Sequence, residues 1–207
     1  MVLNRDKMGE GLQYNVYRLG DERVLKKPKS PLNIYNSLKL YFTSGKDLSE
    51  VFRSENRDKS VEALSNGDLP VEDLFRVREV RDNGDVVQDY LTPVEDELEK
   101  GRDFEQVVND FIDLLHEMWS YGVSDCVYNF TINNGYDGDE LVMMDFGELV
   151  FEYDTVLESI EKKKWLGQWS YNQLSSERQQ IFRDKMNEEI TVNKLDETWR
   201  SEIEEVN

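Results

Sequence analysis

The sequence predicts an α+β protein in two parts, with short strands up to residue 91 and mainly helices after it. Short alternating apolar runs separated by turn signals fill the first part, and the strongest of these turns is Asn83-Gly84. In the second part, apolar side chains recur at helical spacing between Phe104 and Trp119. Together, the two patterns predict a small antiparallel sheet followed by a helical lobe.

Composition disfavours several classes of protein. The 207 residues carry a net charge of -19, which repels a phosphate backbone and argues against nucleic-acid binding. The single cysteine cannot form an intrachain disulfide, and the single histidine disfavours a histidine-based zinc site or a Ser-His-Asp triad. Since the chain lacks a signal segment and an apolar run of about 18 residues, we expect a cytoplasmic protein with no membrane partner.

Two hairpins are expected in the first part. Residues 12–25 have the pattern of two strands around a turn, and residues 75–80 and 86–91 have the same pattern around a second turn. Residues 32–65, between the hairpins, have mostly helical character.

The second part begins with a long amphipathic helix. Its apolar face covers residues 104–119, and Gly122 is suited to end it. A third hairpin is predicted from residues 130–132 and 141–144, and the chain from about residue 155 is helical and highly charged.

Candidate phosphate-binding residues lie near the N-terminus. Gly9 and Gly11 precede Val16, and glycines let backbone amides approach phosphate groups closely. Lys26 lies at the end of the next predicted strand, where a lysine can reach phosphates as a point charge. Because successive strand side chains face opposite sides, only one of Lys26 and Lys27 can face a ligand, and we choose Lys26.

A carboxylate is expected to hold this lysine in place. Glu62, in the run Val61-Glu62-Ala63-Leu64, is the first choice, and Glu55 is the second. Both residues lie in the predicted helical stretch before Pro70.

The sequence Asp145-Phe146-Gly147 follows an apolar run that ends at Met144. Protein kinases use an Asp in this context to hold the metal that bridges the phosphates of ATP. The chain also has the Gly-rich segment, Lys26, a hairpin, a long helix and an Asp/Asn loop in the matching order. In this order and spacing, residues 8–150 resemble the protein-kinase-like superfamily, in the compact form of small, divergent kinases of phage or bacterial type.

The resemblance implies a two-lobed protein-kinase-like fold, with an N-lobe over residues 1–91 and a reduced helical C-lobe over residues 92–207. It also implies that ATP and Mg²⁺ bind between the lobes and that the γ-phosphoryl group is transferred to a Ser or Thr hydroxyl of a protein. By the same resemblance, Asp89 and Leu91 lie in the strand that binds adenine through its backbone, and Gln88 lies near the gatekeeper position.

The catalytic loop of this family reads H-R-D-x-x-x-x-N, where the Asp is the base and the Asn holds a second Mg²⁺. Residues 123–129 correspond to it but lack the His and Arg, and Asp125 and Asn129 are four residues apart instead of five. In one alignment Asp125 is the base, and in the other Ser124 takes its position. We favour Asp125 as the base, with Asn129 and Asp145 as oxygen ligands of Mg²⁺.

Two other classes of function stay open at this stage. The irregular loop at Ser124 and Asp125 favours a pseudokinase, a binding module that regulates a partner with ATP or by shape alone. The net charge of -19 favours an acidic interaction or inhibitor protein without nucleotide chemistry. After Gly147 only 60 residues remain, and they contain no A-P-E sequence, so the way in which a protein substrate is held is not apparent.

Overall fold

A computed structural model describes residues 6–10, 13–29, 54–67 and 69–200. The chain forms two compact units, residues 1–90 and 91–207. The first contains an antiparallel sheet and the second is mainly helical, which confirms the predicted α+β class.

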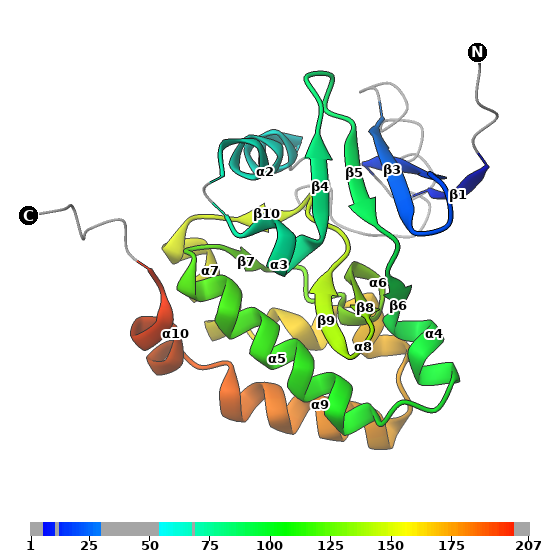
Figure 1. Ribbon diagram of the computed structural model, residues 1–207. Coiled ribbons are helices and arrows are strands. Elements are labelled where there is room, and N and C mark those ends of the chain that lie inside the picture. The colour runs from blue at the N-terminus through cyan, green and yellow to red at the C-terminus, as the bar shows by residue number, and fades with distance from the viewer. Residues whose placement is uncertain (1–5, 11–12, 30–53, 68, 201–207) are drawn as a thin grey trace, which may run out of the picture. The chain divides into compact units, whose positions relative to one another are not determined.

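The first unit is built on a five-stranded antiparallel sheet in the order β1-β2-β3-β5-β4 (Figure 1). Its strands are β1 (Lys7–Glu10), β2 (Tyr14–Arg18), β3 (Arg23–Pro28), β4 (Val77–Val80) and β5 (Val86–Asp89). Leu25, Val86 and Val87 on the inner strands are buried, as expected for strands covered on both faces. Gly9 lies within β1, opposite Val16, so one more strand is present than the sequence predicts.

Among the described residues between β3 and β4, the chain forms α2 (Ser54–Asn66) and α3 (Val71–Phe75). The predicted β4–β5 hairpin is confirmed. In its turn, the Gly84 N–H donates to the Arg81 carbonyl over 2.8 Å, and Gly84 has a φ of +78°. This backbone conformation favours glycine, which explains the strength of the Asn-Gly signal.

The second unit is mainly helical. Its helices are α4 (Val94–Glu99), α5 (Phe104–Ser120), α6 (Phe130–Asn133), α7 (Tyr153–Glu161), the 3-10 helix η2 (Lys164–Gly167), α8 (Trp169–Gln173), α9 (Ser176–Glu189) and α10 (Val192–Thr198). Its short strands are β6 (Thr92–Pro93), β7 (Ser124–Asp125), β8 (Asn134–Asp137), β9 (Glu140–Met143) and β10 (Leu149–Val150). None of the helices in the described residues is both long and apolar enough to cross a membrane.

Helix α5 is the predicted amphipathic helix, and it packs against α9 and α10 (Figure 1). The Asp103 side chain caps its first turn by accepting a hydrogen bond from the Gln106 N–H over 2.9 Å. Gly122, with a φ of +69°, follows its last turn as predicted.

The predicted hairpin of residues 130–132 and 141–144 is wrong in its first strand. The first segment forms α6, and the hairpin consists of β8 and β9. Phe130 stacks on Phe182 of α9 with the ring centres 4.8 Å apart, so α6 buries an aromatic side chain against the helical core. Gly138, with a φ of +64°, lies in the turn that joins the two strands.

Replacing Gly135 of β8 by alanine should destabilise the second unit. A Cβ atom there would lie 2.9 Å from the Leu91 Cβ, 3.0 Å from the Thr92 oxygen and 3.2 Å from the Met144 sulfur. Overpacking of this kind costs about 1–3 kcal/mol of unfolding free energy, measurable by urea denaturation. Gly167→Ala is the control, because a Cβ at Gly167 meets nothing within 4 Å, and equal stabilities of the two variants would contradict the prediction.

Candidate active site

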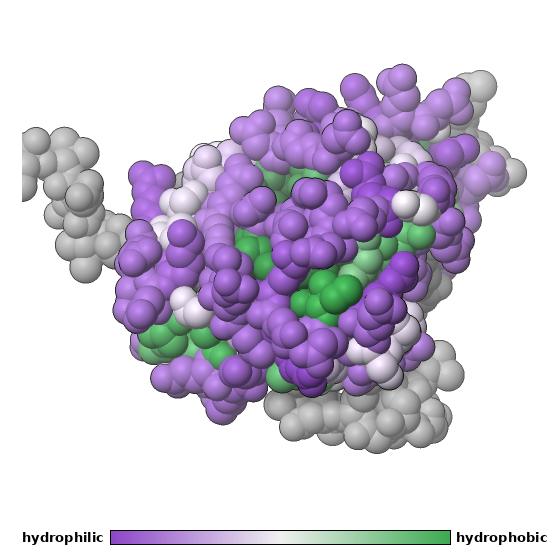
Figure 2. All heavy atoms as spheres, turned by 90° about the horizontal axis from the view of Figure 1, so that it is seen from below, coloured by the Kyte–Doolittle hydropathy of each residue, from purple (hydrophilic) through white to green (hydrophobic). Residues whose placement is uncertain are grey.

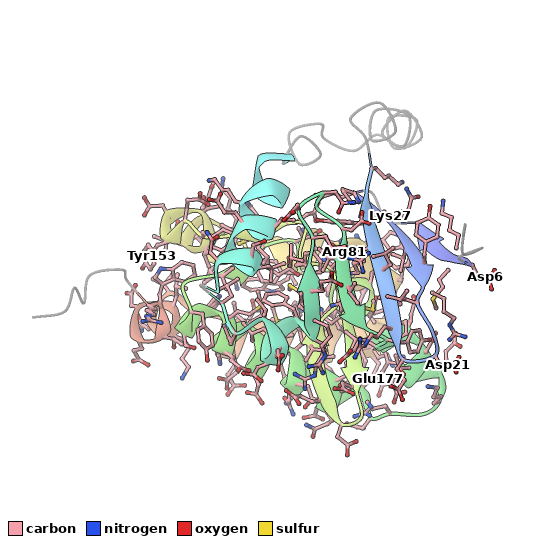
Figure 3. The ribbon with its side chains drawn as sticks, turned by 45° about the horizontal axis from the view of Figure 1, so that its top comes forward. Asp6, Asp21, Lys27, Arg81, Tyr153 and Glu177 are labelled. Carbon is pink, nitrogen blue, oxygen red and sulfur yellow. The ribbon has the colours of Figure 1, made fainter. Side chains whose placement is uncertain are left out.

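In the first unit, Lys26 lies on β3 between Val16 of β2 and Val86 of β5, and it is only 7% exposed. Lys27, which Figure 3 labels, is the next residue of the strand, so its side chain leaves the opposite face of the sheet. Its ammonium lies 5.9 Å from the centre of the Tyr17 ring. Of the two adjacent lysines, Lys26 is therefore the buried one, and it shares a sheet face with Val16.

The proposed partners of Lys26 differ in how far they are described. Glu62 is exposed on α2, while the side chain of Glu55 lies outside the described residues. Gly11, which was predicted to bind phosphate, also lies outside the described residues. The pairing of Lys26 with a helix carboxylate therefore stays a prediction.

The predicted adenine-binding strand is β5 with the residues that follow it. The buried Gln88 donates a hydrogen bond from Nε2 to the Phe75 carbonyl over 2.6 Å. Asp89 accepts two hydrogen bonds from Arg78, at 2.8 Å and 2.6 Å, so its carboxylate has a structural role within the sheet. Leu91 is buried as the first residue of the second unit. The roles of Asp89 and Leu91 toward adenine stay predictions.

In the second unit, Asp125 lies at the end of β7, which pairs with β10. Asp125 is opposite Leu149 and Ser124 is opposite Val150. The Ser124 side chain is completely buried, and its hydroxyl oxygen accepts a hydrogen bond from the Trp119 indole over 3.0 Å. The Ser124 side chain is thus part of the core, whereas its neighbour Asp125 lies near the side chains of Asn133 and Asp145.

The Asp125 carboxylate is 2% exposed, and one of its oxygens accepts a hydrogen bond from the Val127 N–H over 2.8 Å. Its other oxygen is buried and has no hydrogen-bond partner among the described residues. Burial, with a smaller contribution from the nearby charge of Asp145, raises the pKa of Asp125 to about 6. The backbone N–H groups and the Asn133 amide favour the ionised form and offset part of that rise in pKa.

Asn133, at the end of α6, links Asp125 to Asp145. Its side chain contributes to the environment of the Asp125 carboxylate, and its carbonyl oxygen accepts hydrogen bonds from the Met144 and Asp145 N–H groups, at 2.6 Å and 2.9 Å. The Asp145 carboxylate in turn accepts a hydrogen bond from the Gly147 N–H over 3.1 Å. The structure therefore brings Asp125, Asn133 and Asp145 together.

Asn133 was not among the predicted site residues, because the family pattern places the amide five residues after the base, whereas Asn133 lies eight residues after Asp125, at the end of α6. Asn129, the predicted metal ligand, has its side-chain oxygen 3.3 Å from the Ser170 N–H, from which it accepts a hydrogen bond. Its part in metal binding stays a prediction. The adjacent residues Asn133 and Asn134 were the available indication of a polar site at this position, but an Asn-Asn pair is also typical of a loop between two strands.

Tyr128, between Asp125 and Asn129, has a φ of +54°, a conformation that bulky side chains rarely adopt. Its ring is buried and packs edge-on against Trp165, and its hydroxyl lies 2.8 Å from that of Ser159. Such backbone strain costs about 1–3 kcal/mol and concentrates at functional sites, so these contacts hold the loop in a conformation it would not adopt alone.

His116 and Cys126 have structural surroundings. The His116 ring lies beside Trp119, its Nε2 is 3.2 Å from the Glu189 carbonyl at the end of α9, and burial lowers its pKa. Cys126 is buried next to Asp125 in sequence. Neither residue belongs to the group formed by Asp125, Asn133 and Asp145.

The group formed by Asp125, Asn133 and Asp145 supplies oxygen atoms of the kind that Mg²⁺ prefers. No set of three or more His, Cys, Asp or Glu side chains suited to a metal ion occurs in the described parts of the chain. A magnesium ion held by one or two protein side chains and the phosphates of a nucleotide needs no such set, so the residues present fit that arrangement.

Comparisons with known proteins give structural similarity only. No protein-family model matches the chain, and no curated protein matches it. The bifunctional kinase-methyltransferase WbdD is similar at 16% identity over 84% of this chain and 43% of its own, with a TM-score of 0.44. The chain thus spans less than half the length of WbdD. A streptomycin-ATP-APH(2")-IIa complex is similar at 10% identity over 95% of this chain and 92% of its own, with a TM-score of 0.37.

Asp125→Asn should stabilise the second unit near neutral pH in metal-free buffer. The folded-state pKa of about 6 lies above the ordinary value of 3.8, so the folded state binds the proton more tightly and loses stability as pH rises through this window. Removing the charge should raise the free energy of unfolding by about 1–3 kcal/mol at pH 7.5, with no gain near pH 4.

Urea denaturation followed by tryptophan fluorescence measures this effect, because all four tryptophans lie in residues 91–207. Asp113→Asn, at an exposed position of α5, is the matched control. A gain that is the same at pH 4 and pH 7.5 would show that burial of the Asp125 charge is not its cause.

Proposed function

We propose that this protein is a kinase-like enzyme that uses ATP and Mg²⁺ to phosphorylate a hydroxyl group, most simply a Ser or Thr of a protein. The observation that supports this function best is the grouping of Asp125, Asn133 and Asp145 within the second unit. A pair of carboxylates with different surroundings and a neighbouring amide is what a metal-assisted phosphoryl transfer requires.

In the proposed reaction, the acceptor oxygen bonds to the γ-phosphorus, the bond between that phosphorus and ADP breaks, and the hydroxyl proton passes to Asp125. A carboxyl with a pKa of about 6 is mostly ionised at pH 7.5 and is therefore ready to accept this proton. Asp145 and Asn133 would hold Mg²⁺, which when bound neutralises charge on the phosphate oxygens. In the first unit, Lys26 and the Gly9 segment are the residues that the resemblance selects for phosphate binding.

Binding and transfer should be separable by mutation. Asp145→Ala should weaken ATP·Mg²⁺ binding and reduce phosphate transfer about 100-fold or more, because it removes a charged ligand of the metal. Asp125→Asn should retain ATP binding and lose transfer to a similar extent. The thermal shift caused by ATP·Mg²⁺ measures binding, and the transfer of labelled γ-phosphate to a mixture of Ser- and Thr-containing proteins measures catalysis. Asp113→Asn is the control for both.

Two asparagines, Asn133 and Asn129, are alternative ligands for the proposed Mg²⁺ ion. Asn133→Ala should reduce the stabilisation by ATP·Mg²⁺ more than Asn129→Ala does, since the Asn129 amide oxygen is engaged with the Ser170 N–H. Saturating ligand at about a hundredfold excess over its Kd stabilises a binding protein by about 2.7 kcal/mol, which sets the size of the shift to be reduced. If Asn129→Ala loses more of the stabilisation by ATP·Mg²⁺ than Asn133→Ala does, the metal ligand is Asn129, as the sequence predicts.

A nucleotide-binding regulatory module without transfer is the second candidate. The burial of Asp125 favours it, because a base that is 2% exposed must first become accessible to an acceptor. Stabilisation by ATP·Mg²⁺ together with equal phosphate release by the wild type and Asp125→Asn would select this candidate.

A further inference from the structure

The negative charge of the protein is concentrated in the second unit. Residues 91–207 contain 28 Asp and Glu against ten Lys and Arg, a net charge of -18, whereas residues 1–90 contain 16 against 15. One face of the molecule is covered mainly by hydrophilic residues, with apolar residues in small patches (Figure 2). A potential of this sign attracts a positively charged partner.

The asymmetry is sharpest in the segment that holds the candidate site. Residues 103–161 contain 15 Asp and Glu and no Lys or Arg, and they include Asp125, Asn133 and Asp145. Where the family pattern has an Arg before the base, this chain has Ser124, which is fixed to Trp119. Phosphoryl transfer needs positive charge near the phosphate oxygens, and this segment supplies none from its own side chains.

Two exposed apolar side chains lie on α6 and α8, the helices next to the loop that runs from Asp125 to Asn129. Ile132 of α6 is 44% exposed and Trp169 of α8 is 40% exposed. The two helices are joined by the Thr131 and Ser170 hydroxyls, which are 2.9 Å apart, and Ser170 also donates its N–H to Asn129. The exposed face of a tryptophan is a favourable site for an ammonium or guanidinium group.

The Asp125 carboxylate provides an independent indication of a ligand. Its second oxygen is buried without a hydrogen-bond partner among the described residues, although buried carboxylate oxygens are usually paired. Once Asp125 becomes accessible, a donor brought by a bound molecule would satisfy this oxygen. A hydroxyl group is such a donor.

We propose that the acceptor is a Ser or Thr flanked by Lys or Arg in a protein segment, with a flanking cation on the face of Trp169 and the hydroxyl at Asp125. This inference rests on the proposed function and adds the class of acceptor to it. The positive charge of the partner complements residues 103–161, which contain 15 Asp and Glu and no Lys or Arg. Ile132 offers apolar surface for the aliphatic part of a Lys or Arg side chain.

The test measures binding apart from catalysis. Fluorescein-labelled peptides with Ala in place of the acceptor Ser, flanked by four Arg, four Gln or four Glu, are titrated with the full chain and followed by anisotropy. We expect the Arg peptide to bind at least about tenfold more tightly than the Gln peptide, with an affinity that falls as salt rises. Trp169→Ala should weaken its binding about fivefold, near the value of one cation–π contact.

Trp199→Ala is the matched control, because Trp199 follows α10, not α8, and packs edge-on against Tyr153, which Figure 3 labels. Thermal melting verifies that both variants fold. Equal binding of the three peptides, or equal binding by Trp169→Ala and the wild type, would overturn the proposal. Full displacement of the Arg peptide by an equal concentration of a small polyamine would also overturn it, because the site would then hold a free cation.

The corresponding Ser peptides separate this inference from the proposed function. Preferential phosphorylation of the Arg peptide supports both. Phosphorylation of the Gln and Glu peptides at the same rate would leave the kinase function standing and remove the inference about the acceptor. Preferential binding of the Arg peptide with no phosphate transfer would remove the kinase function and, with it, the inference about the acceptor, leaving only a cation-binding surface.

Discussion

The carbonyl oxygen of Asn133 joins the two chain segments on which the candidate site depends. It accepts the N–H groups of Met144 and Asp145, and so it fixes the end of α6 to the start of the Asp-Phe-Gly turn. The β7–β10 pairing closes the same loop of chain at its other end, where Asp125 is opposite Leu149. Because buried backbone groups must be paired, these bonds are retained in the folded state, and the side chains of Asp125, Asn133 and Asp145 are held together as a consequence.

The loop between Asp125 and Asn133 stores unfavourable free energy in two forms. A carboxylate is buried with one oxygen unpaired, and Tyr128 is held at a positive φ. Packing of the Tyr128 ring against Trp165 and stacking of Phe130 on Phe182 oppose both costs. An arrangement that is locally unfavourable and supported by its surroundings is characteristic of a functional site, because stability alone would favour an apolar side chain at Asp125.

Much of the fold follows from patterns within short stretches of the sequence. The α5 helix, the β4–β5 hairpin and the strand that carries Lys26 were all predictable, because each is specified by its own periodicity and turn residues. The third hairpin, predicted from residues 130–132 and 141–144, was wrong in its first strand, because β8 covers Asn134–Asp137. Gly135 pairs with Val142 of β9 and also with Pro93 of β6, which is more than 40 residues away in sequence, and the second pairing leaves no local mark.

The site itself was only partly predictable for the same reason. Asp125 and Asp145 were selected from their place in an ordered set of motifs, whereas Asn133 lies at the end of α6, a helical turn that buries Phe130 and that the sequence pattern did not predict. The choice between Ser124 and Asp125 was open from sequence. The side chains differ in the structure because the Trp119 indole binds the Ser124 hydroxyl, a contact between residues on different elements.

The single histidine of the chain has a consequence for observing the molecule in solution. His116 lies where α5, Trp119 and the last carbonyl of α9 meet. The imidazole protons of the protein therefore come from one ring only, and the neighbouring indole places that ring in an aromatic ring-current field. Its NMR resonances form an intrinsic, single-site reporter of the docking of α9 onto α5, with no need for an introduced label.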